Sequence, residues 1–251
     1  MLAVYGLIAR LAFLPPNVRT GAVQKLAVAG SPKAAEQLIT ILALRDDVVH
    51  GEALAALRTV GPALLKPAMT GLGSDEPKRQ RSGAEALAIL GPGSASALPL
   101  LLGTLANPNL DVRVACLTTI GRLGTYAAEA VNRLTERLDS QHYREISAAA
   151  KSLGQIGAEA KASVPRLMAL VGHPEKDVRD SAADAMGKIG PITKVFIPTL
   201  LEHLTKGDTG VRVAAARALG EMKADAARAI KDLARFVYDP TRDVRQAVAE
   251  A

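Results

Sequence analysis

Residues 177–190 read DVRDSAADAMGKIG, and residues 111–124 read DVRVACLTTIGRLG. Both stretches open on Asp-Val-Arg, continue with small and apolar residues at helical spacing, and close on an apolar residue and glycine. Degenerate copies occupy residues 145–157 and 211–222, and the copies are 30 to 33 residues apart. A phrase repeated at this period is typical of small helical units that bury their apolar faces only against neighbouring units. The sequence therefore predicts a solenoid.

Aligning the copies on the centre of the phrase, which we call offset zero, gives eight positions. They are Val18, Val49, Arg79, Val112, Glu145, Val178, Val211 and Val244. Small residues follow at offset +4, namely Ala22, Ala53, Gly83, Cys116, Ala149, Ala182 and Ala215. Large apolar residues follow at offset +8 and again at +11. Because these offsets share one face of an α-helix, each repeat is predicted to hold one such first helix. The repeats are expected to start near residues 17, 48, 78, 111, 144, 177, 210 and 243.

A second helix is predicted before each offset-zero position, because apolar residues recur at offsets −14, −11, −10 and −7. Val164, Leu167, Met168 and Val171 show this pattern. Pro99, Pro165 and Pro198 all fall at offset −13, in the first turn of such a helix, where proline is tolerated. Glycines such as Gly61, Gly91, Gly157 and Gly190 mark the turns between helices. No stretch has the period of two of a strand, so the chain is predicted to be all-α.

These features resemble the HEAT-repeat family, and within it the short bacterial repeats of the phycobilisome-lyase type. The resemblance covers residues 1–251 and implies a single right-handed α-solenoid of about seven stacked two-helix repeats, with partial repeats at both ends. Val4, Leu7, Ile8 and Leu11 would form a second helix without its first, and residues 241–251 a first helix without its second. Such uncapped ends suggest self-association or a longer solenoid. Two repeats depart from the pattern, at residues 78–80 and 145–146, and should have irregular contacts between repeats.

The composition fits helix stacking and excludes several classes of function. Only three Phe, four Tyr and no Trp are present among 251 residues, which argues against a stacking platform for bases or flat ligands. No apolar run approaches the roughly 18–20 residues of a membrane span. A single cysteine cannot form an internal disulfide, which permits a cytoplasmic location, and we expect one.

The net charge of +6 and the pI near 9.5 admit an acidic partner or nucleic acid. Much of this charge lies in one column, because arginine recurs at offset +1 and aspartate at offset −1. In the family that the chain resembles, such residues form a ladder between adjacent repeats, and an arginine there offers several donors to a neighbouring acceptor. The resemblance assigns this structural role to Arg19, Asp111, Arg113, Asp177, Arg179, Arg212, Asp243 and Arg245.

The sequence shows no catalytic or metal-binding motif. The four histidines form no ligand pair, and no phosphate loop or nucleophile elbow is present. Cys116 falls in the small-residue column, as a buried side chain would. Glu202 and His203 are adjacent on a predicted helix and point about 100° apart, so they form no dyad by themselves. We expect no enzyme, no metal and no cofactor. A bilin lyase subunit stays a second alternative by resemblance alone.

The remaining candidates for a functional surface are charged residues on the outer face of the second helices, which we take as the concave face. Arg235 and Phe236 lie there too, but the surface is mixed in charge and almost free of aromatics, whereas tracking of phosphates requires a more continuous positive stripe. We therefore expect a non-enzymatic scaffold that binds another protein, an acidic one being compatible with the net charge, with nucleic-acid binding as the alternative. The predicted partner-binding residues are Arg133, Glu136, Arg137, Arg166, Glu202 and His203.

Overall fold

The computed structural model describes residues 16–44, 47–190, 197–221 and 230–251. These residues form helices, turns and bends, and none of them lies in a strand, which confirms the all-α prediction. The chain divides into two compact units, Met1–Leu123 and Gly124–Ala251, which we call unit 1 and unit 2. The continuity of a single solenoid across them stays a prediction. The predicted second helix of Val4, Leu7, Ile8 and Leu11 lies outside the described residues.

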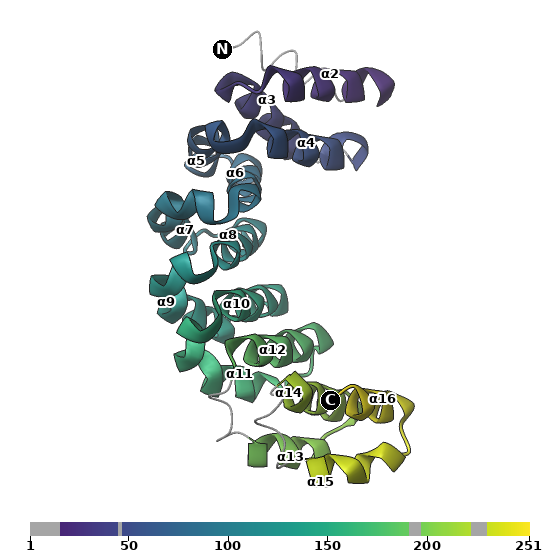
Figure 1. Ribbon diagram of the computed structural model, residues 1–251. Helices are drawn as coiled ribbons and strands as arrows, with labels where there is room; N and C mark the ends of the chain where they lie inside the picture. Colours follow the sequence, from purple (N-terminus) through teal and green to yellow (C-terminus); the bar gives the residue numbers. More distant parts are fainter. Residues whose placement is uncertain (1–15, 45–46, 191–196, 222–229) are drawn as a thin grey trace. The chain divides into compact units, whose positions relative to one another are not determined.

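Each unit contains a layer of first helices and a layer of second helices (Figure 1). The first helices are α2 (Pro16–Ala29), α4 (Asp47–Val60), α6 (Pro77–Leu90), α8 (Leu110–Arg122), α10 (Tyr143–Ile156), α12 (Lys176–Ile189), α14 (Thr209–Glu221) and α16 (Arg242–Glu250). Each of them begins one residue before the start that the repeat pattern predicts. The second helices are α3 (Pro32–Ala43), α5 (Leu65–Leu72), α7 (Leu98–Thr104), α9 (Val131–Glu136), α11 (Val164–Leu170), α13 (Ile197–Lys206) and α15 (Ile230–Leu233).

Several first helices end at or next to a glycine in a backbone conformation that other residues rarely adopt. Gly61, Gly91, Gly124, Gly157 and Gly190 all lie at offset +12, and their φ angles are between 51° and 92°. Glycine has no Cβ to clash there, so it ends the helix and turns the chain towards the second helix. The predicted turn signals are thereby confirmed for these glycines.

The second helices are more broken than the sequence predicts, because short 3₁₀ segments accompany most of them. The segments are η1 (Gly61–Leu64), η2 (Gly91–Ala97), η3 (Gly124–Ala130), η4 (Arg137–Asp139), η5 (Gly157–Ser163) and η8 (Ala234–Tyr238). Pro99 and Pro165 are the second residues of α7 and α11, where their missing N–H groups leave no intrahelical bond unmade. The α-helical part is thus only about two turns long in these repeats.

Small residues allow neighbouring helices to approach closely. A Cβ on Gly83 of α6 would lie 2.3 Å from the backbone nitrogen of Leu72 in α5, and one on Gly154 of α10 would lie 2.7 Å from the Cα of Ala185 in α12. The buried Thr119 Oγ1 donates to the carbonyl of Ala84 at 2.8 Å, which joins α8 to α6. Apolar side chains fill the space between the layers, as dense interior packing requires.

The two layers differ in how tightly they are packed. In unit 2 the first helices α10, α12, α14 and α16 pack directly on one another in sequence. Among the described residues, the second helices α9, α11 and α13 form no comparable contact with the next second helix. A stack of helix pairs bends towards the layer whose helices lie closer together. The first helices therefore form the concave side within unit 2, and the second helices form its convex side.

One described stretch, Pro77–Thr104, is long and apolar enough to cross a membrane by length and composition alone. In the structure this stretch comprises three elements, α6, η2 and α7. The α-helix α6 ends before Gly91, whose φ angle of 51° is positive and lies outside the right-handed helical range. The α6 part packs against α5 and α8, so the stretch is a helix pair of the repeat.

Candidate functional site

The six predicted partner-binding residues all lie on the second-helix layer of unit 2. Arg133 and Glu136 are on α9, Arg137 begins η4, Arg166 is on α11, and Glu202 and His203 are on α13. This corrects the assignment of faces, because the closer packing of the first helices puts the second helices on the convex side. The error arose from taking the second helices as the inner layer. Binding by these residues stays a prediction.

Most charges on this layer have an opposite charge beside them. Arg133 Nε lies 3.6 Å from Glu136 Oε2, Arg166 pairs with Asp139, and Lys206 Nζ lies 2.9 Å from Glu202 Oε1. The hydrogen bond and the charge of Lys206 lower the pKa of Glu202. Exposed pairs of this kind contribute little to stability, because water screens the charges and the long side chains lose freedom in one geometry. These described charges therefore lie in pairs and do not form a continuous positive stripe.

Arg137 has a different environment from the other five. Its Nη1 lies 3.8 Å from Oε1 of Glu145, and the hydroxyl of Ser140 donates to the other carboxylate oxygen of Glu145 at 2.8 Å. Glu145 is buried at offset zero, where most repeats have valine. The irregular contact expected in this repeat is therefore a buried carboxylate beside a half-buried guanidinium. Arg137 therefore interacts with a buried carboxylate of unit 2 as well as with solvent.

We expect Arg137→Ala to lower the free energy of unfolding by about 1 kcal/mol, because it leaves the buried Glu145 with less compensation. Arg133→Ala is the matched control on the same layer. Its exposed pair with Glu136 predicts a loss below about 0.5 kcal/mol. Urea unfolding of both variants measures the difference, and equal losses would show that Glu145 does not depend on Arg137.

His203 does not complete a dyad with its neighbour. Glu202 is exposed and pairs with Lys206, whereas His203 is half-buried and its Nδ1 atom is buried without a hydrogen-bond partner. The two side chains therefore have different surroundings, as the helical spacing predicts.

The arginines at offset +1 bind the turns between repeats. Nη1 of Arg113 donates to the carbonyls of Asn107 and Pro108, Nη1 of Arg179 to those of His173 and Pro174, and Nη1 of Arg245 to those of Asp239 and Pro240. Each bond joins a first helix to the turn that connects it with the preceding repeat. Arg179 also reaches forward, because its guanidinium packs against Gly210 at the start of α14.

Arg212 makes the clearest bond from one repeat to the next. It donates to the carboxylate of Asp239 and, at 3.1 Å, to the hydroxyl of Thr241, both in the turn before α16. For the other members of the predicted ladder, no hydrogen bond to the next repeat is described. Asp177 and Asp243 are exposed, Asp111 is half-buried, and Arg19 lies outside the side chains that the structure describes. The ladder as a whole stays a prediction beyond these bonds.

A column of turn-forming residues at offset −5 was not predicted from the sequence. Each of them accepts a hydrogen bond from the backbone N–H two residues later, which closes a local turn. The residues are Ser74, Asn107, Ser140, His173 and Asp239. The signal was present, because a small polar residue recurs there and proline follows at 108, 174 and 240.

The first-helix layer of unit 2 contains a hollow that involves three consecutive repeats. It is about 440 Å³ and is lined by α12, α14 and α16. Its lining includes Gly210, Val213 and Ala247 together with charged side chains of both signs. Arg217 Nη1 lies 3.3 Å from Asp180 Oδ1, which links α14 to α12 across the hollow.

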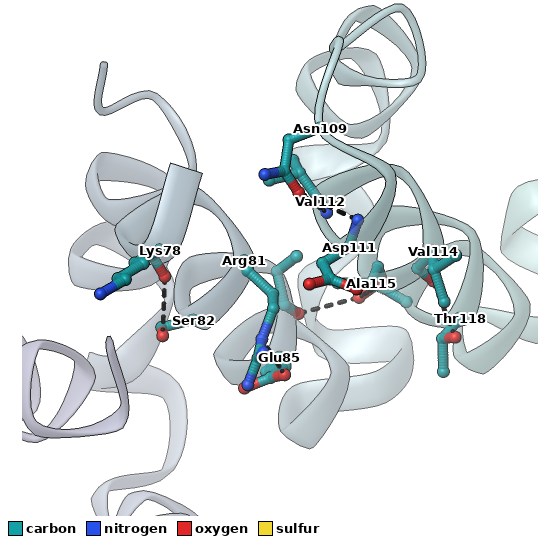
Figure 2. Close-up of polar contacts among 12 residues, drawn as sticks. Lys78, Arg81, Ser82, Glu85, Asn109, Asp111, Val112, Val114, Ala115 and Thr118 are labelled. Atoms are coloured by element: carbon teal, nitrogen blue, oxygen red, sulfur yellow. Dashed lines mark hydrogen bonds and ion pairs between the residues drawn. The ribbon is translucent and has the colours of Figure 1, made fainter. Parts of the chain in front are cut away.

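Figure 2 shows the corresponding layer of unit 1, at α6 and α8. Arg81 Nε donates to Glu85 Oε1 at 2.8 Å, and Asn109 Oδ1 accepts the N–H groups of Asp111 and Val112 at the start of α8 (Figure 2). These bonds stabilise the helices themselves. In the other irregular repeat, Gln80 Oε1 accepts from Asn107 Nδ2 at 2.9 Å, which joins α6 to the turn before α8.

The described residues offer little for catalysis. No group of three or more His, Cys, Asp or Glu side chains among them is arranged to hold a metal ion. Burial raises the pKa of the Cys116 thiol to about 12. Since the thiolate is the reactive form, Cys116 acts as a small core side chain between neighbouring helices.

A sequence model described as HEAT repeats matches residues 62–154, 144–208 and 193–251. The chain belongs to the HEAT-repeat family. This confirms the resemblance to the HEAT-repeat family and the stacked helix-pair fold, whereas the closer resemblance to the phycobilisome-lyase type stays a prediction. A search of curated proteins finds no match to this HEAT-repeat chain.

Solved structures with the same fold include natural and engineered proteins. The karyopherin Kap121p bound to the SUMO protease Ulp1p matches with a TM-score of 0.72 at 16% identity over 98% of this chain, and Kap121p bound to Nup53p matches with a TM-score of 0.73 at 16% identity over the same share. This chain spans 32% of the Kap121p chain. An engineered protein matches with a TM-score of 0.55 at 21% identity, over 74% of this chain and 94% of its own. At such identities the likeness shows the fold alone.

Proposed function

We propose that this HEAT-repeat chain is a non-catalytic scaffold that binds another protein along the first-helix face of unit 2. The observation that carries the proposal is the hollow formed by α12, α14 and α16, because it draws side chains from three consecutive repeats onto one face. A partner lying there would contact several repeats at once.

The charges of this face favour a protein over a polymer of phosphates. At offset +6 the exposed residues are Lys151, Asp184, Arg217 and Glu250, on α10, α12, α14 and α16. Their signs alternate from one repeat to the next. Phosphate binding depends on neutralising successive negative charges with cations, and the acidic residues of this row would oppose it. A protein surface with both signs can match an alternating row.

The fold also lowers the cost of binding. The first helices are locked together by close contacts such as that between Gly154 and Ala185, so the face is formed before a partner arrives. A preformed surface loses little conformational entropy on association. The solved Kap121p complexes with Nup53p and Ulp1p show that a related stack of helices binds protein partners, which supports the same use of this chain.

The test compares two double variants with the same change in charge. Lys151→Glu with Arg217→Glu alters the first-helix face, and Arg133→Glu with Arg166→Glu alters the second-helix face, where the sequence had placed the partner. Partners are first identified by affinity purification from native extract and mass spectrometry, and the purified pair is then measured by titration. We expect at least a tenfold loss, about 1.4 kcal/mol, for the first variant only.

Each of the other outcomes would contradict the proposal in a different way. Loss by the Arg133/Arg166 variant alone would move the site to the second-helix layer. Binding that survives both variants would contradict a partner on either face. Retention of the chain on a DNA duplex with a steep dependence on salt would replace a protein partner by nucleic acid. Circular dichroism checks that both variants keep their helices.

A further inference from the structure

The guanidinium of Arg179 is only partly paired within its own chain. Arg179 is 8% exposed, and its Nη1 donates to the carbonyls of His173 and Pro174 in the turn before α12. Its Nε is buried without a hydrogen-bond partner, and no described residue accepts a hydrogen bond from Nη2. Buried N–H groups are normally paired. The side of Arg179 that packs against Gly210 in the next repeat therefore lacks an acceptor among the described residues.

The equivalent arginine one repeat later has the acceptor that Arg179 lacks. Arg212 occupies the same offset on α14, and its guanidinium donates to the carboxylate of Asp239 and to the hydroxyl of Thr241. Asp239 lies at offset −5 of its repeat, and the residue at that offset before α14 is Lys206. The repeat after Arg179 thus carries a cation where the repeat after Arg212 carries a carboxylate.

Glycine at position 210 also leaves this place without a side chain. Its offset is −1, where three other repeats have aspartate, namely Asp111, Asp177 and Asp243. The neighbouring carboxylate of Asp208 is used locally, because it accepts the N–H of Val211 at 2.9 Å and caps α14. Neither Gly210 nor Asp208 therefore supplies a hydrogen-bonded carboxylate to Arg179.

Arg179 lines the hollow between α12, α14 and α16, so a group from another molecule can approach it there. Lys176 lies three residues earlier on the same face of α12, is exposed and lines the same hollow. The hydroxyl of Thr209, at the start of α14, adds a donor from the next repeat. This end of the hollow therefore gathers donors from two repeats.

The acidic residues of the hollow limit how much negative charge it can take. Asp180 lies 3.3 Å from Arg217, and Glu250 accepts a hydrogen bond from Gln246 at 2.9 Å, so both carboxylates have partners. Asp243 also lines the hollow, from the start of α16, and its charge would repel a ligand of high negative charge. One carboxylate suits this balance better than a string of phosphates.

We propose that an aspartate or glutamate side chain of the partner protein enters this hollow and binds Arg179, with Lys176 beside it. This site rests on the proposed function of the first-helix face and specifies the group that the partner supplies. A hydrogen bond between a guanidinium and a carboxylate is charge-assisted, and it gains strength where little water competes, as at the buried Arg179. The partner's carboxylate would have the role towards Arg179 that Asp239 has towards Arg212.

Two variants at position 210 test the proposal without removing Arg179, whose loss would itself destabilise the fold. Gly210→Asp supplies a carboxylate from the chain itself, and Gly210→Asn has the same size without the charge. An added Cβ would meet the guanidinium of Arg179, which is the end of a flexible side chain and can move. The aspartate should pair with Arg179 and exclude the partner's carboxylate. Circular dichroism verifies that both variants stay folded.

The probe is a blocked pentapeptide with one glutamate among four alanines, and its glutamine counterpart is the control. NMR follows the Nε–H signal of Arg179 and the backbone N–H signal of residue 210 during titration of the intact chain. We expect the glutamate peptide to shift both signals of the wild type to saturation and the glutamine peptide to shift neither. Gly210→Asp should weaken the binding of the glutamate peptide at least about tenfold, and Gly210→Asn less than about threefold.

Equal responses to the two peptides, or no response to either, would overturn the proposal. Equal weakening by Gly210→Asp and Gly210→Asn would also overturn it, because size and not charge would then determine binding. Inorganic phosphate that binds this place more tightly than the glutamate peptide would assign it to phosphate instead.

The identified partner separates this site from the proposed function. A partner that is lost on Lys151→Glu with Arg217→Glu but binds Gly210→Asp like the wild type would leave the scaffold in place and refute the carboxylate. A glutamate peptide that binds as expected, with a partner that survives the Lys151/Arg217 variant, would keep the site and refute the proposed face.

Discussion

Gly83→Ala is expected to destabilise this protein strongly, although alanine is the better helix former. A Cβ at position 83 of α6 would lie 2.3 Å from the nitrogen of Leu72 and 2.7 Å from the carbonyl oxygen of Ala68. These are backbone atoms of α5, so the two helices would have to move apart. We expect a net loss of about 3 kcal/mol in the free energy of unfolding, measured by urea denaturation.

Gly51→Ala in α4 is the matched control. A Cβ there meets nothing within 4 Å, and the residue is exposed in the middle of a first helix. The difference in helix propensity then determines the sign of the effect, and Gly51→Ala should raise the free energy of unfolding by up to about 1 kcal/mol. The two substitutions are chemically identical, so opposite signs isolate the contact between α6 and α5. A stabilised Gly83→Ala variant would show that α5 and α6 do not pack as closely as described.

Arg179→Ala is expected to have the second large effect. Arg179 is buried, and its Nη1 donates at 2.7 Å to the carbonyls of both His173 and Pro174. Without the guanidinium, both carbonyls lose their hydrogen-bond donor, and an empty space is left beside Gly210. Hydrogen bonds to charged groups contribute about 1.5–3 kcal/mol each, so a loss of about 3 kcal/mol is expected.

Arg245→Ala tests whether burial decides that result. Arg245 occupies the same offset and donates to the carbonyls of Asp239 and Pro240, at 2.7 and 3.1 Å, but it is exposed. Water can replace its bonds, so the loss should stay near 1 kcal/mol. Thermal and urea unfolding of the two variants give the comparison. Similar losses would mean that the turn bonds matter equally wherever they lie.

The repeat and its two helices could be predicted because both rest on local spacing. Offsets 0, 4, 8 and 11 define one face of a helix, and glycine at +12 ends it, whatever the rest of the chain does. Which layer lies on the concave side was harder to predict, because it depends on distances between helices of different repeats. A sign of it was nevertheless present, because Gly154 lies on the first helix α10, and the missing Cβ lets Ala185 of the first helix α12 approach closely.

The candidate site was less predictable, because its charges are paired by the fold. Asp139 and Arg166 meet although 27 residues separate them, as do Asp180 and Arg217 although 37 do. No local pattern marks either pair. Glu145 is a similar case, because an acidic residue in a valine column reads as a surface position until the half-buried Arg137 and the hydroxyl of Ser140 are seen beside it.

The glycine joints at the ends of the first helices also bear on how such a chain can change its length. Gly30, Gly61, Gly91, Gly124, Gly157 and Gly190 place such a stop at the same offset of six repeats, and none of these stops depends on a side chain elsewhere. Copying or deleting one segment of 30 to 33 residues therefore brings or removes a complete joint with it. The architecture can be lengthened or shortened by gene duplication and loss without any redesign of the connections.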